Sequence, residues 1–312
     1  MSSNKVPSFA VEVGAALQDS TLSPEQIADR IVSLCRRAVR ESPETPQGDD
    51  NTDSPGLETF LWQVWGALIT LAEEDSSYHD RLASILCEIK SRGREDWALW
   101  DTPFDWANLP VFGFCARENM NGPQPDGQNG RTVARDPEYL AALSGAPPVD
   151  SAASRTGAHA RLKWLNMNAF LARLWVLDVW DCAFYGISTM RMSLEPHSLP
   201  SDSSQSHVGQ PSVELDLEVA ALWVRVAGKR MFECREILGP KGNLDWPPNR
   251  GCPGGSGGTW DGVDGYHPER WQHWKAIFRD ISQGQWRRNV IDAAKAAVEV
   301  MEQIEQEAVA AS

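Results

Sequence analysis

The sequence lacks any segment typical of a protein that enters or crosses a membrane. Its first twenty residues have no basic stretch followed by a continuous apolar run, so they do not resemble a signal peptide. No run of about 20 apolar residues occurs. The longest candidate, LWVLDVWDCAFYGI, is interrupted by Asp178 and Asp181. These absences predict a soluble intracellular protein with a cytoplasmic location.

Positive charge is also scarce. The 312 residues include 29 Lys and Arg against 43 Asp and Glu, which gives a formal net charge of −14. An acidic chain repels phosphate backbones and anionic lipids, so broad nucleic-acid binding and docking on membranes are both disfavoured. We therefore expect the partner to be an unknown protein or a small-molecule ligand, and the oligomeric state stays open.

Motifs of several enzyme classes are missing. None of the six cysteines stands in a CxxC pair, which favours reduced and mostly buried thiols over a zinc or disulfide framework. No GxSxG nucleophile elbow is present, and the glycine-rich string GCPGGSGG (251–258) lacks the Lys-Ser/Thr of a phosphate-binding loop. The sequence therefore predicts no cofactor.

Two short strings resemble metal motifs without their geometry. The string DDNTD (49–53) reads as the DDxxD of class I terpene synthases, but it lies in a loop rich in proline and glycine. Magnesium chemistry needs carboxylates fixed on a rigid wall. The DDxxE motif associated with arginine-type cyclodipeptide synthases does not occur. His267, Glu269 and His273 lack the HExxH spacing of zinc proteases, and His267 precedes Pro268, as at a helix start. No metal site is predicted.

Tryptophan and helical periodicity are what the chain has in abundance. Fourteen tryptophans indicate a core or a pocket built around indole rings. Apolar residues recur at helical spacing through most of the chain, and no strand-like alternation persists. The expected helices, apart from the long central one described below, span residues 24–40, 57–74, 76–90, 109–120, 136–143, 213–238, 267–281 and 285–309.

The expected fold class is all-α, a single bundle or array of antiparallel helix pairs around a long buried central helix. Residues 1–56 are expected to contain an N-terminal helix and a flexible acidic linker, and residues 57–312 the helical domain. Loops rich in Gly, Pro and polar residues near 121–135, 196–212 and 239–266 are expected to be disordered or lid-like.

The most informative pattern is the central stretch RLKWLNMNAFLARLWVLDVWDCAFYGISTMRMSLE (161–195), within an expected helix over 158–195. It reads as one helix that is apolar on nearly every side, which is typical of a buried helix. At about 100° per residue, five of its residues fall within roughly 40° of one another. These five are Asn166, Arg173, Phe184, Arg191 and Glu195. The pattern predicts a polar stripe through the core.

A structural interpretation of this stripe is an internal network of ion pairs and hydrogen bonds. A buried arginine is costly unless it is paired. Arg191 and Glu195 are four residues apart and are expected to face each other. Arg173 is expected to pair with an acid of the helix at 213–238, for which the candidates are Glu214, Asp216 and Glu218. Under this interpretation the protein is a binding or scaffold protein with a structural polar core.

A second interpretation is a pocket between helices, lined by aromatic rings and covered by residues 239–266. Arginine suits planar contacts with a carboxylate or phosphate. The candidate ligand-binding residues are Asn166, Arg173, Phe184, Arg191, Glu195 and Trp223. Such a pocket would belong to a small-molecule binder or an enzyme, for which the sequence indicates no catalytic residues. The structural interpretation is favoured.

Several segments together resemble a large fungal family of uncharacterised, tryptophan-rich helical proteins, catalogued as a domain of unknown function. The resemblance covers most of residues 57–306 and implies a fungal source and one helical domain. It implies no activity and no catalytic residues. The segments that carry it are FLWQVWGALITLAEE (60–74), WLNMNAFLARL (164–174), ISTMRMSLE (187–195), EVAALWVRVAGKRMF (218–232), WQHWKAIF (271–278) and AAKAAVEVMEQIE (293–305).

Overall fold

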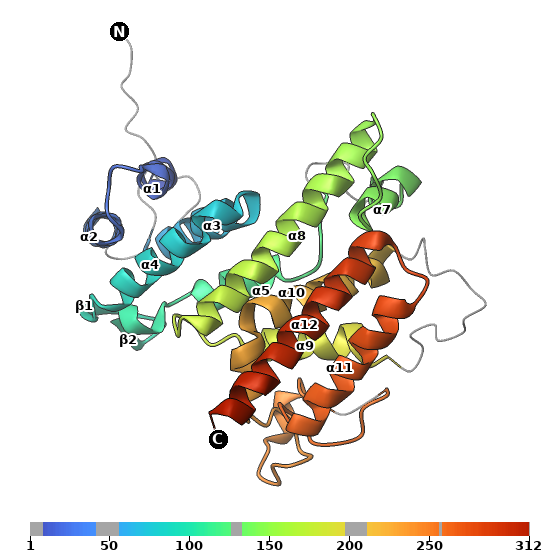
Figure 1. Ribbon diagram of the computed structural model, residues 1–312. Coiled ribbons are helices and arrows are strands. Elements are labelled where there is room, and N and C mark those ends of the chain that lie inside the picture. The colour runs from blue at the N-terminus through green and yellow to red at the C-terminus, as the bar shows by residue number, and fades with distance from the viewer. Residues whose placement is uncertain (1–8, 42–55, 126–132, 197–210, 256–257, 312) are drawn as a thin grey trace. The chain divides into compact units, whose positions relative to one another are not determined.

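The computed structural model describes residues 9–41, 56–125, 133–196, 211–255 and 258–311 (Figure 1). These residues form helices and one two-stranded sheet, which confirms the predicted all-α class. None of the described helices is both long and apolar enough to cross a bilayer. The acidic linker with its DDNTD string, and most of the loops predicted near 121–135 and 196–212, lie outside the described residues.

The chain divides into two compact units, Met1–Gly122 and Pro123–Ser312. The first unit contains helices α1 (Phe9–Gln18), α2 (Pro24–Glu41), α3 (Leu57–Glu74), α4 (His79–Lys90) and α5 (Phe112–Asn119), strands β1 (Arg94–Leu99) and β2 (Thr102–Asp105), and short 3₁₀ turns at Ser76–Tyr78 and Trp106–Asn108.

The N-terminal helices are part of the first unit. α1 packs against α3, and α2 packs against α4. The rings of Phe9 and Phe60 meet edge to face at 5.6 Å, and Arg37 of α2 binds Glu12 of α1 at 2.7 Å. In the structure α1 and α2 share a compact unit with α3 and α4, and the predicted boundary near residue 56 stays a prediction. An amphipathic helix cannot bury its own apolar face, so α1 and α2 pack theirs against α3 and α4.

The first unit also contains a β-hairpin that the sequence analysis did not predict. β1 pairs antiparallel with β2, with Leu99 opposite Thr102. The two residues of the connecting turn, Trp100 and Asp101, have φ angles of 51° and 60°. Positive φ at both central positions is the backbone form that joins twisted strands, but it usually requires Asn or Gly. The pattern was missed because these strands are short and mostly exposed, and because their turn residues are atypical.

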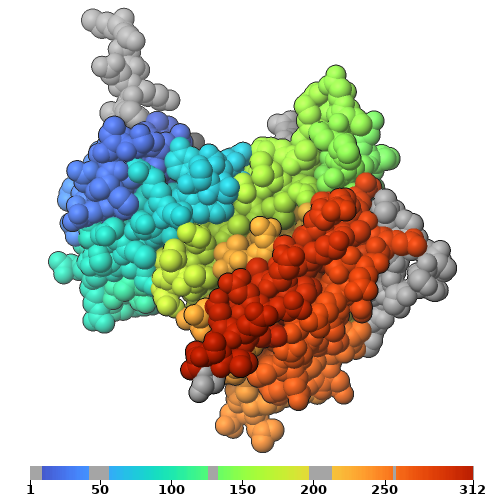
Figure 2. Space-filling view, in the orientation of Figure 1, coloured from blue at the N-terminus to red at the C-terminus, as the bar shows by residue number. Residues whose placement is uncertain are grey.

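The second unit contains helices α7 (Pro137–Leu143), α8 (Ala152–Val176), α9 (Ala183–Leu194), α10 (Pro211–Glu233), α11 (Pro268–Gln283) and α12 (Arg288–Ala310), and a 3₁₀ turn at Pro248–Arg250. α10 is its central helix and packs against α8, α9 and α12. Figures 1 and 2 show α12 lying alongside α11 on one face of this unit. Small residues let the helices approach closely: a Cβ on Gly228 of α10 would lie 3.0 Å from the Ile304 side chain of α12.

The prediction of one continuous central helix is wrong. The stretch breaks into α8 and α9 between Leu177 and Cys182. Asp178 has a φ of 53°, in the left-handed region where helices end. Asp181 then accepts a hydrogen bond from the backbone N–H of Ala183 at 3.0 Å and so begins the next helix. The two aspartates that interrupt the apolar run are therefore the residues that divide the helix.

The segment after α10, here called the strap (residues 239–255 and 258–266), is folded against α9 and α11. Ile237 forms an isolated antiparallel bridge with Gly265. The N–H of Gly254 donates to the carbonyl oxygen of Leu238 at 2.9 Å, and the N–H of Thr259 donates to that of Glu195 at 2.9 Å. These described residues form an ordered structure, and the lid role suggested from sequence stays a prediction.

Candidate functional site

A fully buried ion pair lies at the centre of the second unit. Arg270, 0% exposed on α11, binds Glu195, 2% exposed, at the end of α9. The Nε and Nη2 atoms of Arg270 donate to the two carboxylate oxygens, each at 2.7 Å. The indole Nε1 of Trp274 donates to the same carboxylate at 2.7 Å. Two parallel bonds from a guanidinium to a carboxylate form the strongest side-chain pair that proteins use.

Arginines also fasten the strap to this pair. Nη1 of Arg270 donates to the carbonyl oxygens of Gly254 at 2.7 Å and Gly265 at 3.1 Å. Arg191 of α9 donates to the carbonyl oxygens of Cys252 and Pro253, each at 3.1 Å. The buried charges are therefore paired and hydrogen-bonded, which is the condition for keeping them inside a protein. The network serves as a cross-link between α9, α11 and the strap.

A column of aromatic rings runs from the ion pair to the end of α8. Tyr266 lies between Trp274, at a ring-centroid distance of 6.3 Å, and Trp175, at 5.6 Å. The hydroxyl of Tyr266 donates to the carbonyl oxygen of Ala183 at 2.8 Å. Trp175 also contacts Trp223, whose ring centroid is 6.5 Å away. These contacts leave the Trp175 side chain only 3% exposed.

The structure separates the six residues that the sequence analysis selected. Asn166 and Trp223 are buried, Arg173 is exposed, and Phe184 is 49% exposed on α9. The side chain that binds the Trp223 indole is Asn168, at 2.9 Å. Because the helix breaks, these residues do not form one stripe. Whether any of the six binds a ligand stays a prediction.

The predicted partners of Glu195, Glu214 and Glu218 were wrong, because the structure shows each of these carboxylates in an ion pair with a different arginine. Glu195 pairs with Arg270 and not with Arg191. Glu214 pairs with Arg287 at 3.0 Å, and Glu218 pairs with Arg161. Arg173 is exposed, so it is not the buried charge expected from the apolar pattern. Because the chain turns between α8 and α9, Arg191 of α9 does not continue the helix face that carries Arg173 of α8.

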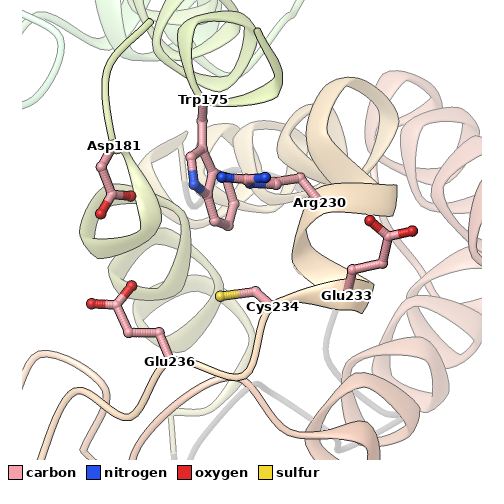
Figure 3. A pocket seen from close by; sticks show the side chains of 6 residues that line it. All are labelled: Trp175, Asp181, Arg230, Glu233, Cys234 and Glu236. Atoms are coloured by element: carbon pink, nitrogen blue, oxygen red, sulfur yellow. The ribbon is translucent and has the colours of Figure 1, made fainter. Parts of the chain in front are cut away.

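A pocket of about 260 Å³ opens where α8 and α10 both end. It is lined by Trp175, Asp181, Arg230, Glu233, Cys234 and Glu236. Figure 3 shows the carboxylates of Asp181 and Glu236 turned toward each other on one side, with Arg230 reaching toward the Trp175 indole from α10. Glu233 extends to the opposite side. Three carboxylates against one guanidinium leave a formal charge of −2 in this lining.

The carboxylates of Asp181 and Glu236 have no ion-pair partner among the described residues. Both residues are exposed, and partial burial together with the neighbouring Asp181 raises the pKa of Glu236. Arg230 is bound elsewhere, to Asp178 at 2.7 Å. The C-terminal ends of α8 and α10 add their negative partial charge to the same region. The pocket therefore has an electrostatic environment that favours a cation.

The chemistry of this cation is restricted by the lining. Across the described residues, no group of three or more His, Cys, Asp or Glu side chains is arranged to hold a metal ion. Burial raises the pKa of the Cys234 thiol, so the thiol is protonated and a poor metal ligand or nucleophile at neutral pH. The Trp175 indole supplies an aromatic face that attracts organic cations. An organic cation fits this combination better than a metal ion does.

Both the ion pair and the pocket lie inside the region that a family profile matches. A profile described as "Protein of unknown function (DUF3632)" matches residues 65–278. The chain belongs to the DUF3632 family. Comparison with curated proteins and with solved structures gives no match. The resemblance to an uncharacterised helical family is thus confirmed, and the function of this family is unknown.

In this DUF3632 member, the two residues that sequence reasoning missed are Arg270 and Glu236. Arg270 follows the sequence His267-Pro268-Glu269, which correctly indicated a helix start: His267 caps α11 and Pro268 is its first residue. Trp271 and Trp274 of the same helix are buried, but no pattern in the sequence indicates that Arg270 is buried beside them. Glu236 follows the last turn of α10 and carries no motif. Only the fold brings it beside Asp181.

Proposed function

We propose that this protein is a binding protein whose acidic pocket holds a basic group presented by a protein partner. The observation that carries the proposal is the pair of facing carboxylates, Asp181 and Glu236, which lie beside the Trp175 indole without a cation of their own. Burial and the negative charge of Asp181 raise the pKa of Glu236, so the ionised form of Glu236 is destabilised in the empty site. A bound cation offsets the repulsion between the carboxylates, so binding lowers the free energy of the site.

The size of the pocket supports a side chain as the occupant. Its volume of about 260 Å³ lies below the range of roughly 300–1,000 Å³ for pockets that enclose drug-sized ligands. A lysine or arginine side chain has one charged end and an apolar stem, which suit the carboxylates and the indole respectively. The partner proposed here is therefore a protein that presents such a side chain, and neither a nucleic acid nor a membrane.

The buried network supports a binding role over a catalytic one. The ion pair of Glu195 with Arg270 is closed to solvent, and Arg270 also donates to the strap. Burial raises the pKa of the Cys234 thiol in the pocket, which disfavours the nucleophilic thiolate form. These groups hold the fold and the pocket wall in place.

The cellular location we propose is a reducing compartment, the cytoplasm. All six cysteines are free thiols, and Cys35, Cys115 and Cys182 are buried. Disulfides are rare where thiols are kept reduced. The family resemblance read from the sequence supports a fungal source.

The test is isothermal titration calorimetry with blocked amino acids at low ionic strength. N-acetyl-arginine amide and N-acetyl-lysine amide are the probes, and the N-acetyl-citrulline amide is the neutral isostere of the first. We expect at least one cationic probe to bind and the citrulline probe not to bind. Glu236→Gln removes a charge-assisted contact and is expected to weaken binding about tenfold or more.

The matched control is Glu299→Gln, which changes the same charge on the exposed surface of α12. It is expected to leave the affinity unchanged. The proposal fails if no cationic probe binds, or if Glu236→Gln and Glu299→Gln bind the probe equally well.

A further inference from the structure

The first unit carries an exposed aromatic patch, here defined as Trp62, Trp100 and Phe114. Trp100, in the turn of the hairpin, is 50% exposed, and Phe114 of α5 is 44% exposed. Their rings meet edge to face at 5.7 Å. The indole Nε1 of Trp100 donates to a carboxylate oxygen of Glu58 on α3 at 2.8 Å. Trp62, one helical turn along α3 from Glu58, is 36% exposed.

The same part of the chain also supplies buried aromatic rings, so the exposure of Trp100 and Phe114 is selective. Phe104, Trp106 and Phe112 are each at most 1% exposed. Two half-exposed rings in contact present apolar surface together, and the polar N–H of Trp100 already has its acceptor. Contiguous exposed apolar surface on a protein typically marks an interaction site.

The backbone that presents the patch is strained. Among the described residues, five that are not glycine have a positive φ, and four of these lie between positions 100 and 111. The four are Trp100, Asp101, Leu109 and Val111, with φ angles of 51°, 60°, 45° and 70°. Such an angle is a clear outlier for a β-branched residue such as valine. Strained residues cluster at functional sites, so the strain agrees with a functional role for this segment.

The charges around the patch indicate the kind of partner. The carboxylates of Glu58, Asp101 and Glu118 have no ion-pair partner in the part of the chain that the structure describes. Arg117 of α5 lies over the Phe114 ring at 5.8 Å, so this ring already attracts a guanidinium. Three carboxylates against one guanidinium leave a formal charge of −2 around the rings. Complementary charge orients partners at an interface, so a basic partner suits this surface.

We propose that the aromatic patch is a docking surface for a protein segment that presents apolar and basic side chains together, as an amphipathic helix does. The apolar side chains of this segment cover the rings, and its lysines or arginines meet the carboxylates. The negative charge disfavours nucleic acids and anionic membranes as occupants. The proposal does not depend on the pocket function, because the patch belongs to the first unit and the pocket to the second.

The experiment measures binding of a synthetic peptide to the full chain. The probe repeats the heptad Leu-Lys-Lys-Leu-Leu-Lys-Leu, which as a helix has one apolar and one basic face. A scrambled peptide of the same composition, without an apolar face, controls for attraction by charge alone. Fluorescence anisotropy of the labelled peptides at physiological ionic strength gives the affinities. We expect the probe to bind the wild type, and the scrambled peptide to bind about tenfold or more weakly.

Single substitutions then place the probe on the patch. Trp100→Ser and Phe114→Ser should each weaken probe binding about tenfold or more, because each removes one ring of the patch. Val11→Ser is the control, since Val11 is an apolar residue of the same unit that is 61% exposed, and the affinity should not change. Asp101→Asn should weaken binding about twofold or more by removing one charge, and asparagine tolerates a positive φ. Glu299→Gln, on the exposed surface of α12, should leave the affinity unchanged.

The docking role is overturned if the probe does not bind, or if Trp100→Ser and Phe114→Ser bind it as tightly as Val11→Ser does. Equal binding of the scrambled peptide would show attraction by charge alone and would also overturn it. If Asp101→Asn and Glu299→Gln bind the probe equally, the partner is not basic. Thermal melts confirm that each variant is folded.

The arginine probe keeps this proposal apart from the pocket function. Trp100→Ser should leave the affinity for N-acetyl-arginine amide unchanged, since that probe reports on the pocket of the second unit. A protein that binds the peptide but not N-acetyl-arginine amide would retain the docking surface and lose the pocket function. Loss of N-acetyl-arginine amide binding in Trp100→Ser would overturn the independence of the two sites.

Discussion

Replacing Arg270 with methionine tests whether the buried ion pair is a structural cross-link. Methionine fills much of the volume of the arginine stem but carries neither the charge nor the donors. Glu195 would then be a carboxylate at 2% exposure whose remaining donor is the Trp274 indole. The carbonyl oxygens of Gly254 and Gly265 would lose a donor as well.

The expected cost is large. Removing one partner of a buried pair typically lowers the free energy of unfolding by about 3–5 kcal/mol. Each buried carbonyl left without a donor adds about 1 kcal/mol or more. Domains are stable by roughly 5–15 kcal/mol, so Arg270→Met should remove at least a third of the stability of a typical one. The cost arises from an uncompensated charge, and removing that charge should recover part of it.

The assay is urea unfolding followed by circular dichroism and tryptophan fluorescence, for wild type, Arg270→Met, Glu195→Leu and the double variant. The double variant should be more stable than the sum of the single losses predicts, with a coupling of about 2–3 kcal/mol. Arg279→Met is the control, because Arg279 lies on the same helix and pairs with Glu302 at the surface. That exposed pair should contribute about 1 kcal/mol or less.

The reasoning is refuted if Arg270→Met costs no more than Arg279→Met. It is also refuted if the losses of Arg270→Met and Glu195→Leu are additive, because independent losses would mean that the two charges do not interact.

Three further outcomes are expected. Binding of the arginine probe should weaken as the pH falls, because protonation of Glu236 removes the charge that attracts the probe. Burial raises the pKa of Glu236, so calorimetric titrations at a series of pH values should show the loss beginning above the pKa of an ordinary glutamate. Gly157→Ala should lower the free energy of unfolding in urea by about 1–3 kcal/mol, since its Cβ would lie 2.3 Å from the Tyr139 carbonyl oxygen. Gly66→Ala is the control, because its Cβ would meet no atom within 4 Å and should not destabilise the protein. Thiol labelling followed by mass spectrometry should modify the exposed Cys87 before the buried cysteines.

Most of the helices were predictable because helix formation leaves a local, periodic signature. The expected helix over residues 57–74 matches α3, and the expected start at His267-Pro268 matches α11. α1 was missed although Phe9, Val13, Ala16 and Leu17 recur at helical spacing and are buried. The hairpin was missed because its turn carries Trp100 and Asp101, where glycine or asparagine usually marks such a turn.

The break in the central stretch shows where local reading failed. Apolar residues continue through the turn between α8 and α9, so periodicity alone extends the helix across it. Asp178 and Asp181 were visible as interruptions of the apolar run, but their backbone roles were not read from them. Once the helix breaks, the angular relation between Asn166 and Glu195 disappears, and with it the predicted stripe.

The sequence by itself determined the all-α class, the tryptophan-rich core and the excess of negative charge. Each of these follows from composition or from spacing within one segment. Only the tertiary structure decided that Glu195 pairs with Arg270, 75 residues away, and that Asp181 meets Glu236 beside Trp175. Such pairs depend on which helix ends meet, and charges distant in sequence leave no periodic pattern to reveal their partners.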